Sequence, residues 1–130
     1  GSMQLINGAY DFKADAFNSV WGIFEIDLSE KNSQDVYTVL VNAFTSSNNG
    51  EKSYIYVKES KDIPDLNDDT GRLLYATGIT KRNDNRIYVE GGKKYYLHFI
   101  HSVQGIYSYR KALSVNYIKV FSDYVQNGIG

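Results

Sequence analysis

Residues 86–101 (RIYVEGGKKYYLHFIH) constrain the fold of this chain more than any other stretch. Apolar and polar side chains alternate on both sides of a Gly-Gly pair, as in two β-strands that each bury one face. A loop of Gly91, Gly92 and Lys93 would place the apolar residues of both arms on one face, whereas a one-residue slip would exchange the faces. The stretch therefore predicts a hairpin whose core face carries Ile87, Val89, Tyr95, Leu97 and Phe99.

The opposite face of this predicted hairpin carries Tyr88, Tyr96 and His98, which we expect to point outward. His98 and His101 are the only histidines of the chain. Side chains three residues apart in a strand point to opposite faces. We therefore do not expect the two histidines to ligate one metal ion or to flank one substrate.

The rest of the chain is also typical of strands, because no segment keeps the 3.6-residue apolar period that a helix needs. Trp21 lies near the start of an apolar strand and is predicted to serve packing. Besides the hairpin arms, strands are predicted at residues 4–12, 20–28, 35–44, 53–58, 72–78 and 113–121. Seven or eight short strands with turns between them indicate a β-sandwich or barrel. The prediction is an all-β, antiparallel two-sheet β-sandwich of jelly-roll type, with an immunoglobulin-like sandwich as the alternative.

Length and charge narrow the range of functions. The 130 residues suffice for one domain, which we place at residues 4–122, with residues 1–3 as a cloning scar and residues 123–130 as a C-terminal tail. No cysteine is present, so disulfides and thiolate metal sites are excluded. A net charge of −1 provides no strong field for nucleic acid. No apolar run approaches the roughly 18 residues of a membrane span.

The acidic segment 59–71 is the one candidate metal site. Asp65, Asn67 and Asp69 follow the i, i+2, i+4 spacing of the first ligands in a calcium loop. Thr70 stands where such a loop has glycine, and the segment leads into a strand rather than a helix. A structural calcium ion is therefore one interpretation and a solvated turn is the other. No other cofactor is predicted.

Aromatic residues are the main candidates for ligand binding, since 12 of the residues are tyrosines. Exposed aromatic planes can stack on the apolar faces of sugar rings, and tyrosine and arginine are also frequent in protein interfaces. Tyr54 and Tyr56 are expected to belong to a covered sheet face. The predicted ligand-binding residues are Tyr107, Tyr109, Arg110, Tyr88, Tyr96 and His98.

Catalytic motifs are missing from the sequence. Neither a G-x-S-x-G elbow nor an H-E-x-x-H motif occurs. Glu25 and Asp27 share a strand face, where two carboxylates could reach the separation of about 5–9.5 Å that a glycosidase uses. Solvated strand faces often carry such pairs. The prediction is a non-enzyme, with a small glycan-active enzyme as the alternative.

Four segments resemble a known family in their order: FEIDL at 24–28, YTVLV at 37–41, YIYVK at 54–58 and GGKKYYLHF at 91–99. They resemble small bacterial jelly-roll accessory domains of the pre-peptidase C-terminal type. The late hairpin also resembles β-sandwich modules of phage tail fibres. Both resemblances imply a non-catalytic binding or adhesion module of a larger extracellular protein, at a cell surface or on a virion. The expected partner is cell-surface carbohydrate, and the alternative is an assembly domain that contacts other protein chains.

Overall fold

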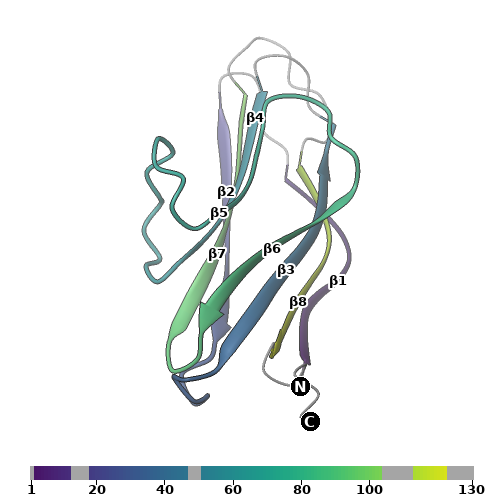
Figure 1. The fold of residues 1–130 in the computed structure, drawn as a ribbon. Coiled ribbons are helices and arrows are strands. Elements are labelled where there is room, and N and C mark those ends of the chain that lie inside the picture. The colour runs from purple at the N-terminus through teal and green to yellow at the C-terminus, as the bar shows by residue number, and fades with distance from the viewer. Residues whose placement is uncertain (1, 13–17, 47–50, 104–112, 123–130) are drawn as a thin grey trace.

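The computed structural model describes residues 2–12, 18–46, 51–103 and 113–122, which form two antiparallel sheets packed face to face (Figure 1). One sheet has the strand order β1-β8-β3-β6 and the other β2-β7-β4-β5. This confirms the predicted all-β sandwich. The strands are β1 (Ser2–Phe12), β2 (Ser19–Asp27), β3 (Val36–Thr45), β4 (Glu51–Lys58), β5 (Arg72–Ala76), β6 (Asn83–Glu90), β7 (Lys94–Val103) and β8 (Leu113–Ser122).

The pairing of strands shows the jelly-roll topology. β1 pairs with β8, β2 with β7, β3 with β6 and β4 with β5, all antiparallel. The chain is thus arranged as one long hairpin, with its tip between β4 and β5, that is rolled into two sheets. Eight strands in this arrangement define a jelly roll rather than an immunoglobulin-like sandwich.

The core lies between the two sheets and is built from alternate residues of each strand, as a period of two requires. Phe12 of β1 and Phe99 of β7 come from different sheets, and their ring centroids lie 5.1 Å apart. β3 has buried residues on both faces, and it lies between β8 and β6, as predicted for the most apolar strand.

The predicted hairpin at residues 86–101 is wrong in its pairing. β6 pairs with β3, whereas β7 pairs with β2 and β4, so residues 91–93 cross from one sheet to the other. Val89 lies opposite Tyr37, and Tyr95 lies opposite Ile26. The predicted core face is nevertheless confirmed, because the inner faces of both sheets meet in one core. That core includes Val89, Tyr95, Leu97 and Phe99, with Ile87 packed against it.

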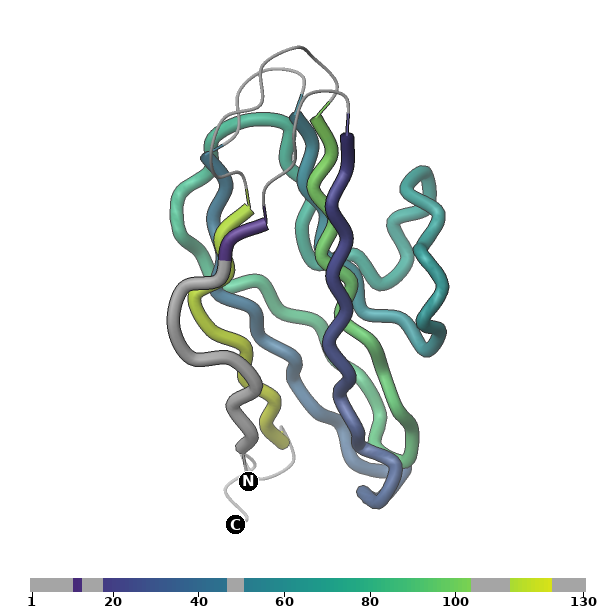
Figure 2. The backbone as a smooth tube through the Cα atoms, turned by 180° about the vertical axis from the view of Figure 1, so that it is seen from behind, coloured from purple at the N-terminus to yellow at the C-terminus, as the bar shows by residue number. Residues whose placement is uncertain are grey.

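The predicted outer face is correct only in part. Tyr88 is 63% exposed, but Tyr96 is only 9% exposed and His98 is completely buried. The connection of residues 59–71 covers the outer sides of β4 and β7. It projects beyond that sheet in both views of the backbone (Figures 1 and 2). A covered sheet face is confirmed for Tyr54 and Tyr56, which are also buried.

The predicted domain limits differ slightly from the strands. β1 begins at Ser2, within the residues assigned to a cloning scar, and it pairs there with the end of β8. Residues 123–130, assigned to the tail, lie outside the described residues. No helix in the described part of the chain is long and apolar enough to cross a membrane.

Candidate functional site

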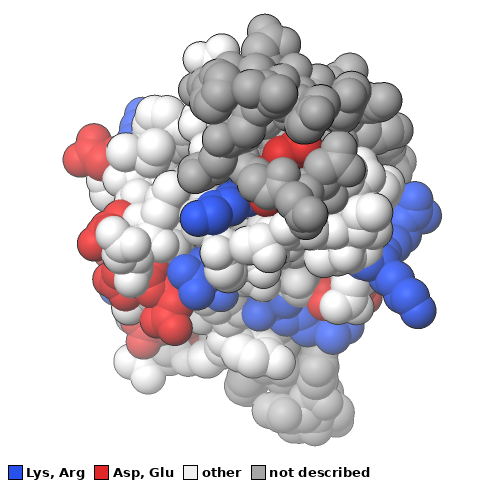
Figure 3. Space-filling view, turned by 90° about the horizontal axis from the view of Figure 1, so that it is seen from above, with Lys and Arg blue, Asp and Glu red and all other residues white. Residues whose placement is uncertain are grey.

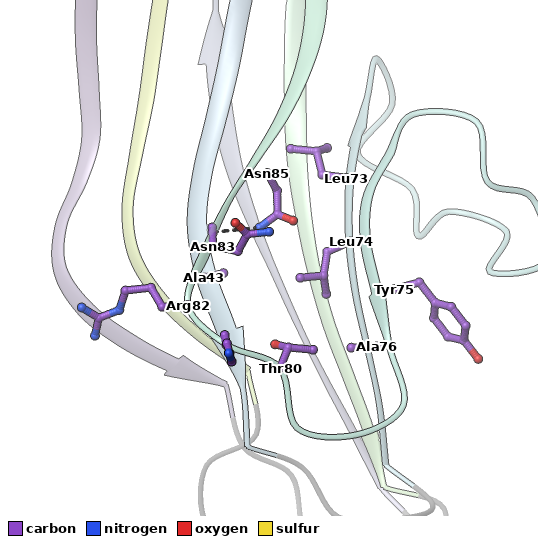
Figure 4. A pocket seen from close by; sticks show the side chains of 10 residues that line it. Ala43, Leu73, Leu74, Tyr75, Ala76, Thr80, Arg82, Asn83 and Asn85 are labelled. Carbon is purple, nitrogen blue, oxygen red and sulfur yellow. Dashed lines mark hydrogen bonds between the residues drawn. The ribbon is translucent and has the colours of Figure 1, made fainter.

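A cavity of about 550 Å³ opens between β5, the last strand of one sheet, and β6, the last strand of the other (Figure 4). Its volume falls within the roughly 300–1,000 Å³ of small-ligand sites. We call this cavity the β5–β6 groove. It is lined by Ala43, Leu73, Leu74, Tyr75, Ala76, Thr80, Lys81, Arg82, Asn83 and Asn85.

The floor of the β5–β6 groove is apolar. Ala43 belongs to the core, and Leu73 and Leu74 pack against it, so the floor continues the inner faces of the two sheets. Ala43 and Ala76 have small side chains, which leaves space between the strands. Tyr75 points away from the other lining residues, towards the outer side of its sheet (Figure 4).

The wall on the β6 side is polar and partly held by the protein itself. The Thr80 hydroxyl accepts a hydrogen bond from the Thr45 backbone N–H at 2.9 Å. The side-chain amide of Asn85 donates to the carbonyl oxygens of Val41 at 3.1 Å and Asn83 at 3.2 Å. These bonds fix the wall of the groove before any ligand is bound.

Two polar side chains of this wall remain available to a ligand. Lys81 and Asn83 are exposed, and neither side chain makes a hydrogen bond or an ion pair within the described residues. Arg82 points away from the groove, with its guanidinium 5.6 Å from the centre of the Phe44 ring. The groove thus combines an apolar floor with one free ammonium group and one free amide.

A second cavity, of about 250 Å³, lies further along β6. It brings in Tyr88, which the sequence predicted as a binding residue, together with Lys58 and Glu59. Tyr95, which also lines this cavity, donates its hydroxyl to the carbonyl of Glu90 at 2.9 Å and is thereby fixed.

Neither cavity presents paired acids. The residues that line the larger cavity include no carboxylate and no imidazole, and Glu59 is the only carboxylate lining the smaller one. Asp27 lies on β2 and is engaged by the backbone N–H and hydroxyl of Ser29, whose hydrogen bonds lower the pKa of this carboxyl. The described residues therefore do not place two carboxylates across either cavity, as glycoside hydrolysis requires.

A serine, a histidine and a glutamate meet inside the sandwich. The His101 ring lies with Nδ1 3.0 Å from the Ser53 hydroxyl and Nε2 3.1 Å from the Glu51 carboxylate. These residue types occur in nucleophilic catalysis, but all three side chains are buried and none lines either cavity. Burial lowers the pKa of His101 despite the nearby carboxylate. A neutral ring that donates from Nε2 and accepts at Nδ1 satisfies both hydrogen bonds.

His98 occupies a different environment on the outer face, so the predicted separation of the two histidines is confirmed. Its Nε2 lies 2.9 Å from the carbonyl oxygen of Ser60, and its Nδ1 lies 3.1 Å from the indole nitrogen of Trp21. Burial lowers the pKa of His98. His98 therefore attaches the 59–71 connection to the sheet and is not available to a ligand.

Both histidines should make the protein less stable in mild acid. Their pKa values in the folded state lie below the ordinary value of 6.5, so the unfolded chain binds more protons than the folded chain. We expect the free energy of unfolding to be maintained above pH 6.5 and to fall as the pH drops below it.

Thermal unfolding between pH 8 and pH 5 measures this effect, and His98→Gln should reduce the loss of stability. Asp27 and Asp68 have lowered pKa values too, but their ordinary value is 3.8, so their contribution is lost in a more acidic range. A melting temperature that stays constant from pH 8 to pH 5 would contradict the assignment.

The remaining predicted site residues are not brought together. Tyr107, Tyr109 and Arg110 lie outside the described residues. In the acidic segment, the Asp65 carboxylate accepts the Asn67 backbone N–H at 2.9 Å, which closes a local turn. The described residues contain no group of three or more histidine, aspartate or glutamate side chains that could hold a metal ion. Calcium binding by Asp65, Asn67 and Asp69 stays a prediction.

One pattern in the sequence could have indicated the groove. Asn83 and Asn85 alternate in step with Ile87 and Val89 in β6, so these four side chains point to the same face of the strand. Two positions on this core-facing side are therefore polar. The sequence could not reveal that this strand end lies beside β5, because the two strands belong to different sheets. Trp21, which the sequence predicted to pack, lies against the His98 ring with its indole nitrogen 3.1 Å from His98 Nδ1, and it remains 43% exposed on the outer face.

Comparison with known proteins does not extend these observations. No protein-family model matches the chain, and no curated protein matches it.

Proposed function

We propose that the protein is a non-catalytic binding or adhesion module of a larger extracellular or phage tail protein, and that it recognises cell-surface carbohydrate in the β5–β6 groove. The observation that carries this proposal is the pair of unengaged polar side chains, Lys81 and Asn83, above an apolar floor. A sugar ring presents apolar C–H faces and a rim of hydroxyl groups. The floor complements the former, while an amide and an ammonium group complement the latter.

The composition of the groove also favours binding over catalysis. General acid–base chemistry needs a titratable group that lies within hydrogen-bond reach of the substrate and titrates near the working pH. The titratable residues that line the groove are Tyr75, Lys81 and Arg82. None of them is a histidine, an aspartate or a glutamate, the side chains that most often act as a general base. A glycan-active enzyme therefore remains the less favoured alternative.

Loss of the two free polar groups should abolish most of the binding. In a glycan-array screen, Lys81→Ala combined with Asn83→Ala is expected to weaken the signal of the best ligands about tenfold to a hundredfold, since each lost hydrogen bond is worth about 0.5–1.5 kcal/mol, and more when a charge takes part. The matched control is Arg86→Ala, because Arg86 lies on the outer face of the same strand and its contact with Asp84 is a 3.8 Å surface ion pair.

The same screen tests the remaining features of the proposal. An arm with EDTA reports whether calcium contributes, and Tyr107→Ala with Tyr109→Ala reports on these two predicted binding residues. Equal binding by the wild type and the Lys81/Asn83 double variant would show that the groove is not the binding site. If no glycan on the array binds the protein, the proposed function is wrong.

A second candidate is an assembly domain, which is favoured by the free edge of β6. Among the described strands, this strand pairs only with β3, so its other edge offers backbone donors and acceptors to an extended segment of another chain. Asp84 and Arg86 place charges on this strand, which is a usual protection against edge pairing. Analytical ultracentrifugation separates the candidates, because an assembly domain should self-associate or bind protein while the glycan array stays empty.

A further inference from the structure

Trp21 is the only tryptophan of the chain, and it lies exposed on the outer face of β2. Its side chain is 43% exposed, and Ile23, two residues further along the same face, is 37% exposed. β2 is an edge strand, and in the view from behind it runs along most of the length of the molecule (Figure 2). A large apolar side chain at such a position loses the free energy that burial would provide.

The orientation of Trp21 is fixed by a buried partner. The indole N–H donates to His98 Nδ1 at 3.1 Å, and the two ring planes differ by only 7°. His98 is completely buried, and its Nε2 lies 2.9 Å from the Ser60 carbonyl oxygen. Because a neutral imidazole donates from one nitrogen and accepts at the other, this arrangement fixes the tautomer of His98 and holds the indole in place.

The hydrogen bond to His98 also limits what Trp21 can offer. Its only donor is already used, so the exposed part of the ring presents an apolar plane and no polar group. A ring that is held rigidly binds a flat partner with little further loss of entropy. The geometry therefore suits stacking rather than hydrogen bonding.

We propose that Trp21 is a stacking platform for a sugar ring, and that it forms a second carbohydrate contact outside the β5–β6 groove. This inference rests on the proposed function for the class of ligand. The polar residues of β2 agree with it, because Ser19 and Glu25 lie on the same outward-facing series and are exposed. They place a hydroxyl before Trp21 and a carboxylate after Ile23; the Ser19 hydroxyl donates to Ser102 at 3.2 Å and can still accept a hydrogen bond from a sugar hydroxyl.

The size of the exposed strip argues against a protein partner. A stable protein interface buries roughly 800 Å² on each side. A whole aromatic side chain contributes about 150–250 Å², and less than half of Trp21 is exposed. The Trp21–Ile23 strip is thus large enough for a sugar ring and far smaller than a protein interface.

The single tryptophan allows the inference to be tested directly on the whole chain. N-acetylchitohexaose, cellohexaose, an oligogalacturonate and any ligand found on the array are titrated while tryptophan emission and acrylamide quenching are recorded. We expect a ligand that binds by calorimetry to shift the emission and to reduce quenching. Trp21→Ala should weaken its affinity about tenfold, which corresponds to the loss of one stacked ring.

Two further variants separate stacking from a structural role. Trp21→Phe keeps an aromatic plane but loses the hydrogen bond to His98, so it should retain most of the affinity, whereas a purely structural Trp21 would make it as harmful as Trp21→Ala. Val36→Ala is the matched control, because Val36 is an exposed apolar residue, 42% exposed, of the other sheet. A ligand that binds without changing the quenching, and equally well to Trp21→Ala, would overturn the inference and leave the proposed function intact. If no glycan binds at all, both fail.

Discussion

Replacement of Phe99 by alanine is expected to lower the free energy of unfolding by about 3–5 kcal/mol. Phe99 is completely buried in the middle of β7. Its ring stacks on Phe12 of the other sheet at 5.1 Å and meets the edge of Phe24 at 5.7 Å. Truncation would remove the ring that joins the two sheets and leave a cavity that a rigid sandwich cannot close. Urea denaturation followed by circular dichroism measures the loss.

Tyr88→Ala is the matched control for Phe99→Ala, since Tyr88 is an aromatic strand residue that is 63% exposed. Its effect should stay within about 0.5 kcal/mol, the usual range for a surface position. A loss of less than about 2 kcal/mol for Phe99→Ala would show that the two sheets do not depend on this contact.

Gly91→Ala is expected to lower the free energy of unfolding by about 1–3 kcal/mol, the cost of overpacking a filled core position. A Cβ atom at this position would lie 2.3 Å from the backbone oxygen of Asn32. The backbone there is held in place, because Gly91 N–H donates to Asp35 O at 3.0 Å and Gly92 N–H donates to Leu28 O at 2.7 Å. The clash therefore involves backbone that cannot move aside as a flexible side chain would.

Gly78→Ala is the control for Gly91→Ala, because a Cβ at Gly78 meets no atom within 4 Å. It should leave the midpoint of denaturation nearly unchanged. The comparison also tests the crossing of residues 91–93 between the sheets. In a simple hairpin, Gly91 would not lie against the 28–35 connection, and Gly91→Ala would then be as mild as Gly78→Ala.

Much of the fold could be predicted from the sequence, because the period of two is a local property of each strand. It assigned the correct faces to Val89, Leu97 and Phe99, all of which lie in the core. It also placed His98 and His101 on opposite faces. The alternation does not identify the partner of each strand, because the same pattern suits any neighbouring strand that completes the core. The arms at residues 86–101 therefore looked like a hairpin, although each belongs to another sheet.

The candidate site was harder to predict than the fold. Exposure of Tyr88 followed from its parity, but the burial of Tyr96 and His98 depends on the 59–71 connection that folds over their side of the sheet. Trp21 was expected to pack because it begins an apolar strand, but the 59–71 connection covers the outer sides of β4 and β7 and leaves Trp21 on β2 43% exposed. The groove arises where the last strands of two sheets lie side by side, and no local pattern records that proximity.

By itself, the sequence determined the strands, their inner faces and the absence of helices from the described residues, because these depend on side-chain alternation between neighbours in the chain. It also determined that the chain has no thiolate chemistry and no strong charge. The tertiary structure decided which strands pair, which outer positions are covered and where a cavity remains. Those features depend on contacts between residues far apart in the chain, such as Gly91 with Asn32 and His98 with Trp21, and only the rolled arrangement of the sheets brings such residues together.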